Sequence, residues 1–215
     1  RIEIKQCFDN YGDLLLEYIP STKEILFTQS GEPITNIWVY EWNVKDKKFK
    51  KSNVVDLRYS WILEAIAIPQ KNLILFGTRG NGILILGLKE KNFIKRLEKI
   101  QETNSMLLIN DDYLLVGGEL GEMHLVSVDK CSSKSMIIME SDITASDFFV
   151  NGFGKVEEIV DKYDDYRIFL GDYDGNLQVC TFDPKAKYFL TKIYELKVHD
   201  EILRCYFVNE REILF

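Results

Sequence analysis

Residues 114–129 read LLVGGELGEMHLVSVD, two short apolar runs joined by a glycine-rich turn. The same pattern occurs as ILFGTRGNGILILGLK at residues 74–89 and as IFLGDYDGNLQVCTFD at residues 168–183. In each copy a glycine ends the first run and an apolar residue follows it six positions later. Short runs of β-branched and aromatic residues bounded by glycine are typical of strands, so the pattern predicts β-hairpins that repeat along the chain.

The repeat is long enough for four strands. The aligned glycines are 40 residues apart from Gly77 to Gly117 and 54 apart from Gly117 to Gly171, and a fainter copy covers residues 25–42. One repeat divides into strands at 61–68, 73–78, 83–88 and 93–100, and the next at 106–109, 113–118, 123–128 and 135–139. At 93–102 a strand is favoured over a helix, because one repeat should behave like its neighbours. We therefore predict an all-β fold, a β-propeller of four-stranded antiparallel blades with about four to five blades present.

The residues that end each third strand resemble the WD40 repeat family, which closes that strand with a Trp-Asp pair. The matching pairs here are Trp42-Asn43, Leu88-Lys89, Val128-Asp129 and Phe182-Asp183. The family also places a Gly-His pair before the first strand, where this chain has Val198-His199. The resemblance implies that His199 is a buried, hydrogen-bonded structural histidine. His124 aligns with Leu84 and Gln178 inside a third strand and needs no chemical role.

The length suggests an incomplete ring. A ring of roughly six to eight such blades needs more than 215 residues, and the sequence begins at Arg1 and ends on ILF. We expect a single incomplete WD40-like domain over 1–215, belonging to a longer chain. Its approximate blades are 1–55, 56–101, 102–140, 141–196 and a partial 197–215. The remainder of the ring would come from missing sequence or from another chain.

Composition excludes several classes of function. Hydrophobic residues make up 46% and charged residues 28%, with a formal net charge of −7, which is typical of a globular protein and argues against sequence-independent nucleic-acid binding. We expect no membrane span and a cytoplasmic, intracellular location, with cytoskeletal or ciliary association left open. The four cysteines have no Cys-x-x-Cys spacing and only two histidines accompany them, so we expect no metal and no cofactor. No nucleophile elbow or other catalytic constellation is found, and we predict that the chain is not an enzyme.

These observations favour a protein–protein interaction scaffold or adaptor within a multiprotein complex, with other proteins as its partners. The family resemblance implies that second-to-third-strand turns and fourth-to-first-strand links share one rim that receives partners. The predicted rim residues are Arg79, Glu119, Asp172, Tyr173, Tyr59 and Trp61, with His199 in the same set of links. One alternative is a propeller enzyme or small-ligand sensor with its site in the central channel. Another is a purely structural segment of a large assembly.

Overall fold

The computed structural model describes residues 14–19, 24–29, 36–43, 45, 48–56, 61–88, 93–150, 166–202, 206–209 and 212–214. For the strands within 14–56 and 206–214 it describes the course of the backbone alone. The described residues form strands and two three-residue 3-10 turns, η1 (Pro69–Lys71) and η2 (Glu119–Gly121). None of their helices is long or apolar enough to cross a membrane. The chain divides into two compact units, Arg1–Arg96 and Leu97–Phe215.

Unit one contains two four-stranded sheets, each with its strands in chain order. The first comprises β1 (Leu14–Ile19), β2 (Glu24–Gln29), β3 (Asn36–Asn43) and β4 (Lys48–Asp56). The second comprises β5 (Trp61–Ile68), β6 (Leu73–Arg79), β7 (Ile83–Gly87) and β8 (Phe93–Leu97), whose last residue lies at the boundary with unit two. The first strands of the two sheets, β1 and β5, lie next to each other.

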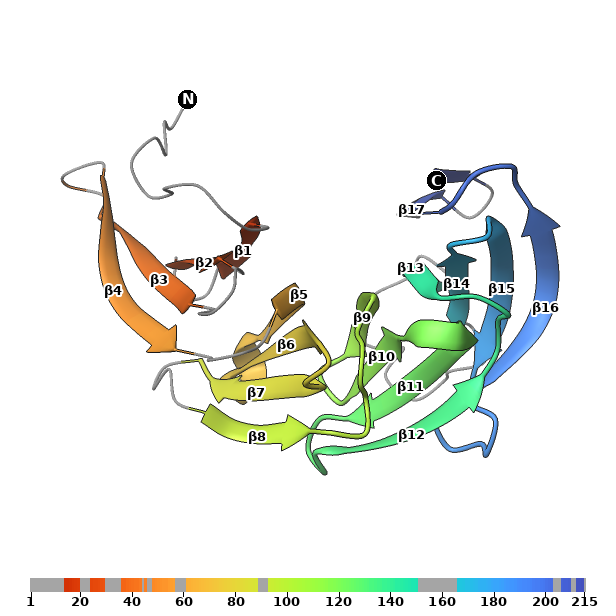
Figure 1. Ribbon diagram of the computed structural model, residues 1–215, viewed down its shortest axis with the longest axis horizontal. Helices are drawn as coiled ribbons and strands as arrows, with labels where there is room; N and C mark the ends of the chain where they lie inside the picture. The colour runs from red at the N-terminus through yellow and green to blue at the C-terminus, as the bar shows by residue number, and fades with distance from the viewer. Residues whose placement is uncertain are drawn as a thin grey trace. The chain divides into compact units, whose positions relative to one another are not determined.

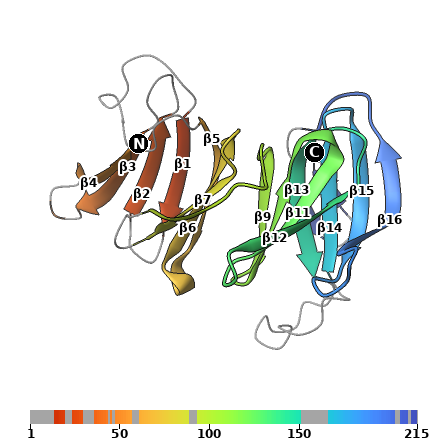
Figure 2. The same ribbon diagram turned by 60° about the horizontal axis from the view of Figure 1, so that its bottom comes forward.

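Unit two repeats this arrangement (Figure 1). Its first sheet comprises β9 (Ser105–Asn110), β10 (Tyr113–Gly117), β11 (Glu122–Ser127) and β12 (Ser132–Ile137). Its second comprises β13 (Ile143–Val150), β14 (Tyr166–Asp172), β15 (Asn176–Phe182) and β16 (Leu190–Lys197), which Figure 2 shows side by side. A two-stranded sheet follows, β17 (Tyr206–Asn209) and β18 (Glu212–Leu214). The first strands β9, β13 and β17 are neighbours in this order.

The prediction of an all-β chain built from four-stranded antiparallel sheets is confirmed. The strand predicted in place of a helix after residue 93 is found as β8. The strand predicted at 135–139 is misplaced, because β12 runs from Ser132 to Ile137. Its first four residues, Ser132–Ser135, are polar, so this part of the strand has no apolar pattern to detect. An outer strand does not need such a pattern, because it is paired on one edge only. The chain leaves the ladder after Ile137, where the amides of Ile138 and Met139 donate to the carbonyl of Gly121.

The core of unit two lies between its two four-stranded sheets. Leu115, Met123 and Leu125 of the first sheet pack against side chains of β14 and β15. The second sheet contributes Ile168, Leu170, Cys180 and Phe182, together with Phe189 and Leu190 beyond β15. Side chains that alternate along paired strands place one apolar set on each face, so two sheets packed face to face bury these sets together.

Strands β6 and β7 in unit one are buried on both faces, as the inner strands β10 and β11 of unit two are. All residues of β7 are buried, and so are the five residues from Ile74 to Thr78 in β6. A strand that is buried on both faces reads as a continuous apolar run. The sequence ILIL at 83–86 is therefore explained by its central place in the β5–β8 sheet.

We expect Phe182→Ala to lower the free energy of unfolding by about 3–5 kcal/mol, because it leaves a cavity between the two sheets of unit two. Urea denaturation followed by fluorescence measures the change. Tyr188→Ala is the matched control, since its ring is 62% exposed and its loss should cost no more than about 0.5 kcal/mol. Equal losses from both substitutions would contradict the packing described.

Candidate functional site

Four segments of unit two meet at one end of its sheets. They are the β10–β11 turn at 118–121, the β12–β13 link at 139–142, the β14–β15 turn at 172–175 and the segment 198–201 after β16. In a four-stranded meander, the turn between the second and third strands and the link to the next sheet lie at the same end of the sheet. Backbone hydrogen bonds join the four segments directly. We call these residues the unit-two rim.

Asp142 holds two turns of the unit-two rim together. Its carboxylate accepts a hydrogen bond from the amide of Leu120 (2.8 Å), and its backbone carbonyl accepts one from the amide of Tyr173 (3.0 Å). The two amides belong to turns of different sheets. One residue of the link therefore fixes the positions of both turn tips relative to each other, and a hydrogen bond to a carboxylate is stronger than one between neutral groups.

A second contact recurs from sheet to sheet. The amide of Ile143, at the start of β13, donates to the carbonyl of Gly118 (3.1 Å). The amide of Ile202 donates in the same way to the carbonyl of Asp172 (3.1 Å). Gly118 and Asp172 each follow the aligned glycine of their repeat, so one geometry joins each turn to the segment that follows its sheet.

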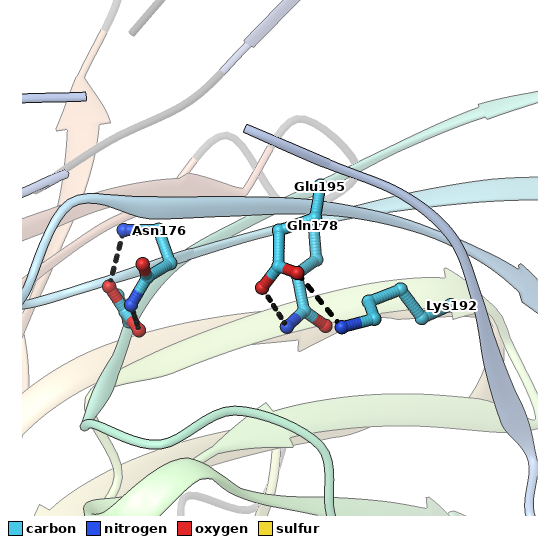
Figure 3. A network of polar contacts seen from close by, with 5 residues as sticks. Asn176, Gln178, Lys192 and Glu195 are labelled. Atoms are coloured by element: carbon cyan, nitrogen blue, oxygen red, sulfur yellow. Dashed lines mark hydrogen bonds and ion pairs between the residues drawn. The ribbon is translucent and has the colours of Figure 1, made fainter. Parts of the chain in front are cut away.

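Asp172 stabilises its own turn. Its side chain is fully buried, and its two carboxylate oxygens accept hydrogen bonds from the backbone amide and the side-chain amide of Asn176, both at 2.7 Å. Figure 3 shows Asn176 with these two contacts. The sequence predicted Asp172 as a partner-binding residue. The structure corrects this, because a buried and doubly bonded carboxylate offers no surface to a partner.

The other predicted rim residues fall into three groups. Tyr173, which is 57% exposed, and the exposed Glu119 both lie on the unit-two rim. Arg79 is exposed at the end of β6 in unit one and is not part of the unit-two rim. Trp61 begins β5, and the structure describes only its backbone. Tyr59 lies outside the described residues.

Two residues of the unit-two rim differ from the sequence-based expectations. Leu120 is 75% exposed at the tip of its turn, with a backbone φ of 51°. Sequence reasoning missed it, because a leucine inside a repeat is expected to face the core. His199 was expected to be a buried structural histidine, and it is exposed instead. Val198 and Ile202 of the same segment pack with Phe169 and Leu177, and His199 between them lies in solvent.

The unit-two rim is acidic. Glu119, Asp174, Asp200 and Glu201 are exposed, and Asp142 is partly exposed. No lysine or arginine occurs in the four segments of this rim. The turn at 183–188 between β15 and β16, at the opposite end of the sheet, carries Lys185 and Lys187 instead. Exposed carboxylates gathered in these four segments produce a negative local potential at this end of unit two.

A polar network on β15 and β16 has no reactive group (Figure 3). Glu195 accepts hydrogen bonds from Lys192 (3.0 Å) and Gln178 (3.2 Å), and these contacts lower the pKa of its carboxyl, with Lys192 the larger cause. Burial raises the pKa of the Cys180 thiol to about 12, opposed by the charge of Lys192, so this thiol stays protonated and unreactive. Among the described residues no three His, Cys, Asp or Glu side chains are grouped to hold a metal ion.

His124 is buried in β11 with one ionic neighbour. Its Nε2 lies 3.3 Å from the Glu122 carboxylate. Burial lowers the pKa of the imidazole below its ordinary value of 6.5, and Glu122 opposes this shift through its charge and hydrogen bond. The neutral imidazole is therefore the form that the folded chain favours.

We expect Gly121→Ala to destabilise unit two by about 3 kcal/mol or more. Gly121 has a φ of 71°, and a Cβ there would overlap the backbone carbonyl of Met139. Gly80→Ala is the matched control: its φ of 80° is equally left-handed, but no atom lies within 4 Å of an added Cβ. The control should cost only about 1 kcal/mol of backbone strain. Urea denaturation compares the two, and similar losses would contradict the close approach of turn and link.

We expect the free energy of unfolding to decrease as the pH falls below about 6.5, in part because of His124. The folded-state pKa of His124 is lowered, so below 6.5 the unfolded chain binds a proton that the folded chain does not. The His124 contribution is complete above 6.5 and is lost progressively down to the lowered pKa. Urea denaturation at a series of pH values from 5 to 8 measures the slope. His124→Gln, which places the residue type of the aligned Gln178, should reduce it, and an unchanged slope would contradict this assignment.

Comparison with protein-family models and with curated proteins finds no match to this sequence.

Proposed function

We propose that the sheets of this chain are successive blades of a β-propeller that resembles the WD40 type. Two features support the proposal. Each four-stranded sheet is a meander in chain order, and within each unit the first strands of consecutive sheets are neighbours. The contact between a turn and the segment that follows its sheet also recurs with the same distance at Ile143 and at Ile202. A blade-by-blade repeat requires both features.

We further propose that the protein is a non-catalytic scaffold that binds another protein through the unit-two rim. The observation that carries this proposal is the exposure of Leu120 and Tyr173 on two turns that the same residue, Asp142, holds in place. Large apolar side chains on a fixed backbone lose little conformational freedom when they bind. Such preorganised anchors contribute most of the binding energy of many interfaces.

The charges around these anchors indicate the kind of partner. Exposed carboxylates of Glu119 and Asp174 flank Leu120 and Tyr173 in sequence, and Asp200 and Glu201 lie on the adjacent segment. A partner surface with basic side chains around an apolar centre would complement this pattern. Complementary charges increase the rate of association and reject acidic competitors, while the apolar contacts limit dissociation.

We expect the double substitution Leu120→Ala and Tyr173→Ala to reduce recovery of a stoichiometric partner by at least about tenfold, since each anchor of this kind contributes roughly 1–2 kcal/mol. The measurement is native affinity purification of the protein with quantitative mass spectrometry of the proteins that copurify. The matched control is Tyr188→Ala, because Tyr188 is equally exposed but lies in the turn at the other end of the sheet.

Stability must be measured in parallel. The double variant should unfold at the same urea concentration as the unsubstituted protein, because both side chains are largely in solvent. Substitution of Glu119 and Asp174 by lysine should weaken the same partner and reduce the dependence of its binding on salt. Undiminished recovery from the alanine double variant would contradict the assignment of this rim.

A further inference from the structure

The β6–β7 turn of unit one, residues 79–82, contains an asparagine followed by a glycine, Asn81-Gly82. Asparagine is a chemically labile residue, because the backbone nitrogen of the next residue is close enough to attack its side-chain carbonyl carbon. A glycine at the next position has no Cβ to hinder this attack, and its backbone rotates more freely than that of other residues. The other Asn-Gly pair, at 151–152, lies outside the described residues.

The turn presents this pair with an uneven set of hydrogen bonds. Asn81 is partly exposed and follows the exposed Gly80. The carbonyl of Gly82 accepts hydrogen bonds from the backbone amide (3.2 Å) and the hydroxyl (2.7 Å) of the buried Thr78. The amide of Gly82 finds no acceptor among the described residues. The carbonyl of this glycine is therefore fixed, whereas no described group holds the nitrogen that would attack Asn81.

The aligned turn of the β13–β16 sheet contains a related pair, Asp174-Gly175, with a different hydrogen bond. The amide of Gly175 donates to the carbonyl of Asp172 (3.2 Å). The two glycines are otherwise alike, since both are buried and their φ angles are 80° at Gly175 and 73° at Gly82. A nitrogen that donates a hydrogen bond must give up that bond before it can attack. Attack from Gly175 therefore costs one hydrogen bond more than attack from Gly82.

We propose that Asn81 is a site of spontaneous deamidation, at which an isoaspartate forms in the β6–β7 turn. The amide nitrogen of Gly82 loses its proton and bonds to Cγ of Asn81. The bond between Cγ and Nδ2 breaks, and the side-chain nitrogen leaves as ammonia with that proton. Water then opens the cyclic succinimide at either of its carbonyls, which gives aspartate or isoaspartate. The net reaction consumes one water and releases one ammonia, so it requires no oxidant, reductant or enzyme.

The two products differ in their effect on the turn. Aspartate adds a negative charge and keeps the backbone unchanged. Isoaspartate carries the backbone through the former side chain, which inserts one methylene before Gly82. Because hydrogen bonds require a particular distance and direction, a longer path from Thr78 to Gly82 displaces the carbonyl that Thr78 binds. The isoaspartate form should therefore weaken the β6–β7 hairpin. This inference does not use the unit-two rim and can hold or fail independently of the proposed function.

The first experiment follows the reaction in the full chain, incubated in a mildly alkaline buffer that helps to remove the amide proton. Samples are digested with trypsin in heavy-oxygen water, so that any conversion during digestion carries a heavy label. The lysines and arginines of the chain release Asn81 in peptide 80–89 and Asp174 in peptide 168–185. Mass spectrometry with electron-transfer fragmentation then measures the isoaspartate in each peptide without that label.

Each rate is divided by the rate at the same position in the chain unfolded in guanidinium chloride, which removes the intrinsic difference between the two pairs. We expect this ratio to be larger for Asn81 than for Asp174 by about fivefold, the factor that one backbone hydrogen bond of ordinary net strength corresponds to. Asn81→Gln should abolish the conversion, because its longer side chain would have to close a larger ring. Equal ratios would overturn the proposal, and so would an unmodified peptide 80–89 from folded protein while the unfolded chain converts.

The second experiment tests the effect on the turn. Amide hydrogen exchange is measured for the fresh protein, for protein enriched in isoaspartate at position 81, and for freshly prepared Asn81→Asp. This variant is the matched control, since it adds the charge without lengthening the backbone. We expect faster exchange in residues 78–83 of the isoaspartate form alone. Equal exchange in all three proteins, or equally fast exchange in Asn81→Asp, would overturn the assignment of the effect to the longer backbone.

Discussion

The two four-stranded sheets of unit two depend on each other to cover an apolar face. A four-stranded sheet with alternating side chains has two faces, and a single sheet cannot bury the residues of either face by itself. In unit two the need is met when Phe182 and Ile168 of one sheet pack on Leu115 and Leu125 of the other. The register within each sheet follows from this requirement, because a slip by one residue would turn the buried side chains to the other face.

Polar contacts at the rim of unit two define the alignment of the sheets more narrowly than apolar packing can. Burial is proportional to area and tolerates small shifts, whereas a hydrogen bond requires a particular distance and direction. Asp142 satisfies amides from two turns, and Asp172 satisfies two donors of Asn176 within one turn. The two aspartates thus have different structural roles, since Asp142 joins two turns and Asp172 stabilises one turn. The exposed side chains on these turns are those of Leu120 and Tyr173.

Much of the secondary structure could be predicted from the sequence, because the apolar runs and turn glycines are local signals. The strands around Gly77, Gly117 and Gly171 were found at the predicted places, and β8 is a strand as its neighbours implied. Polar β12 was misplaced, since an outer strand is specified by its partner and not by its own pattern. The exposure of Leu120 and His199 and the burial of Asp172 could not be read from sequence, because each depends on where a second segment passes.

The change in exposure across the β13–β16 sheet has a consequence for local stability. An outer strand whose side chains lie in solvent opens at a lower free energy than an inner strand whose side chains are buried. Opening would start at the outer strand β16, whose residues after Leu190 are exposed, and proceed inward toward β14. The β13–β16 sheet therefore contains a gradient of local stability, lowest in the exposed strand β16 and highest in the buried strand β14.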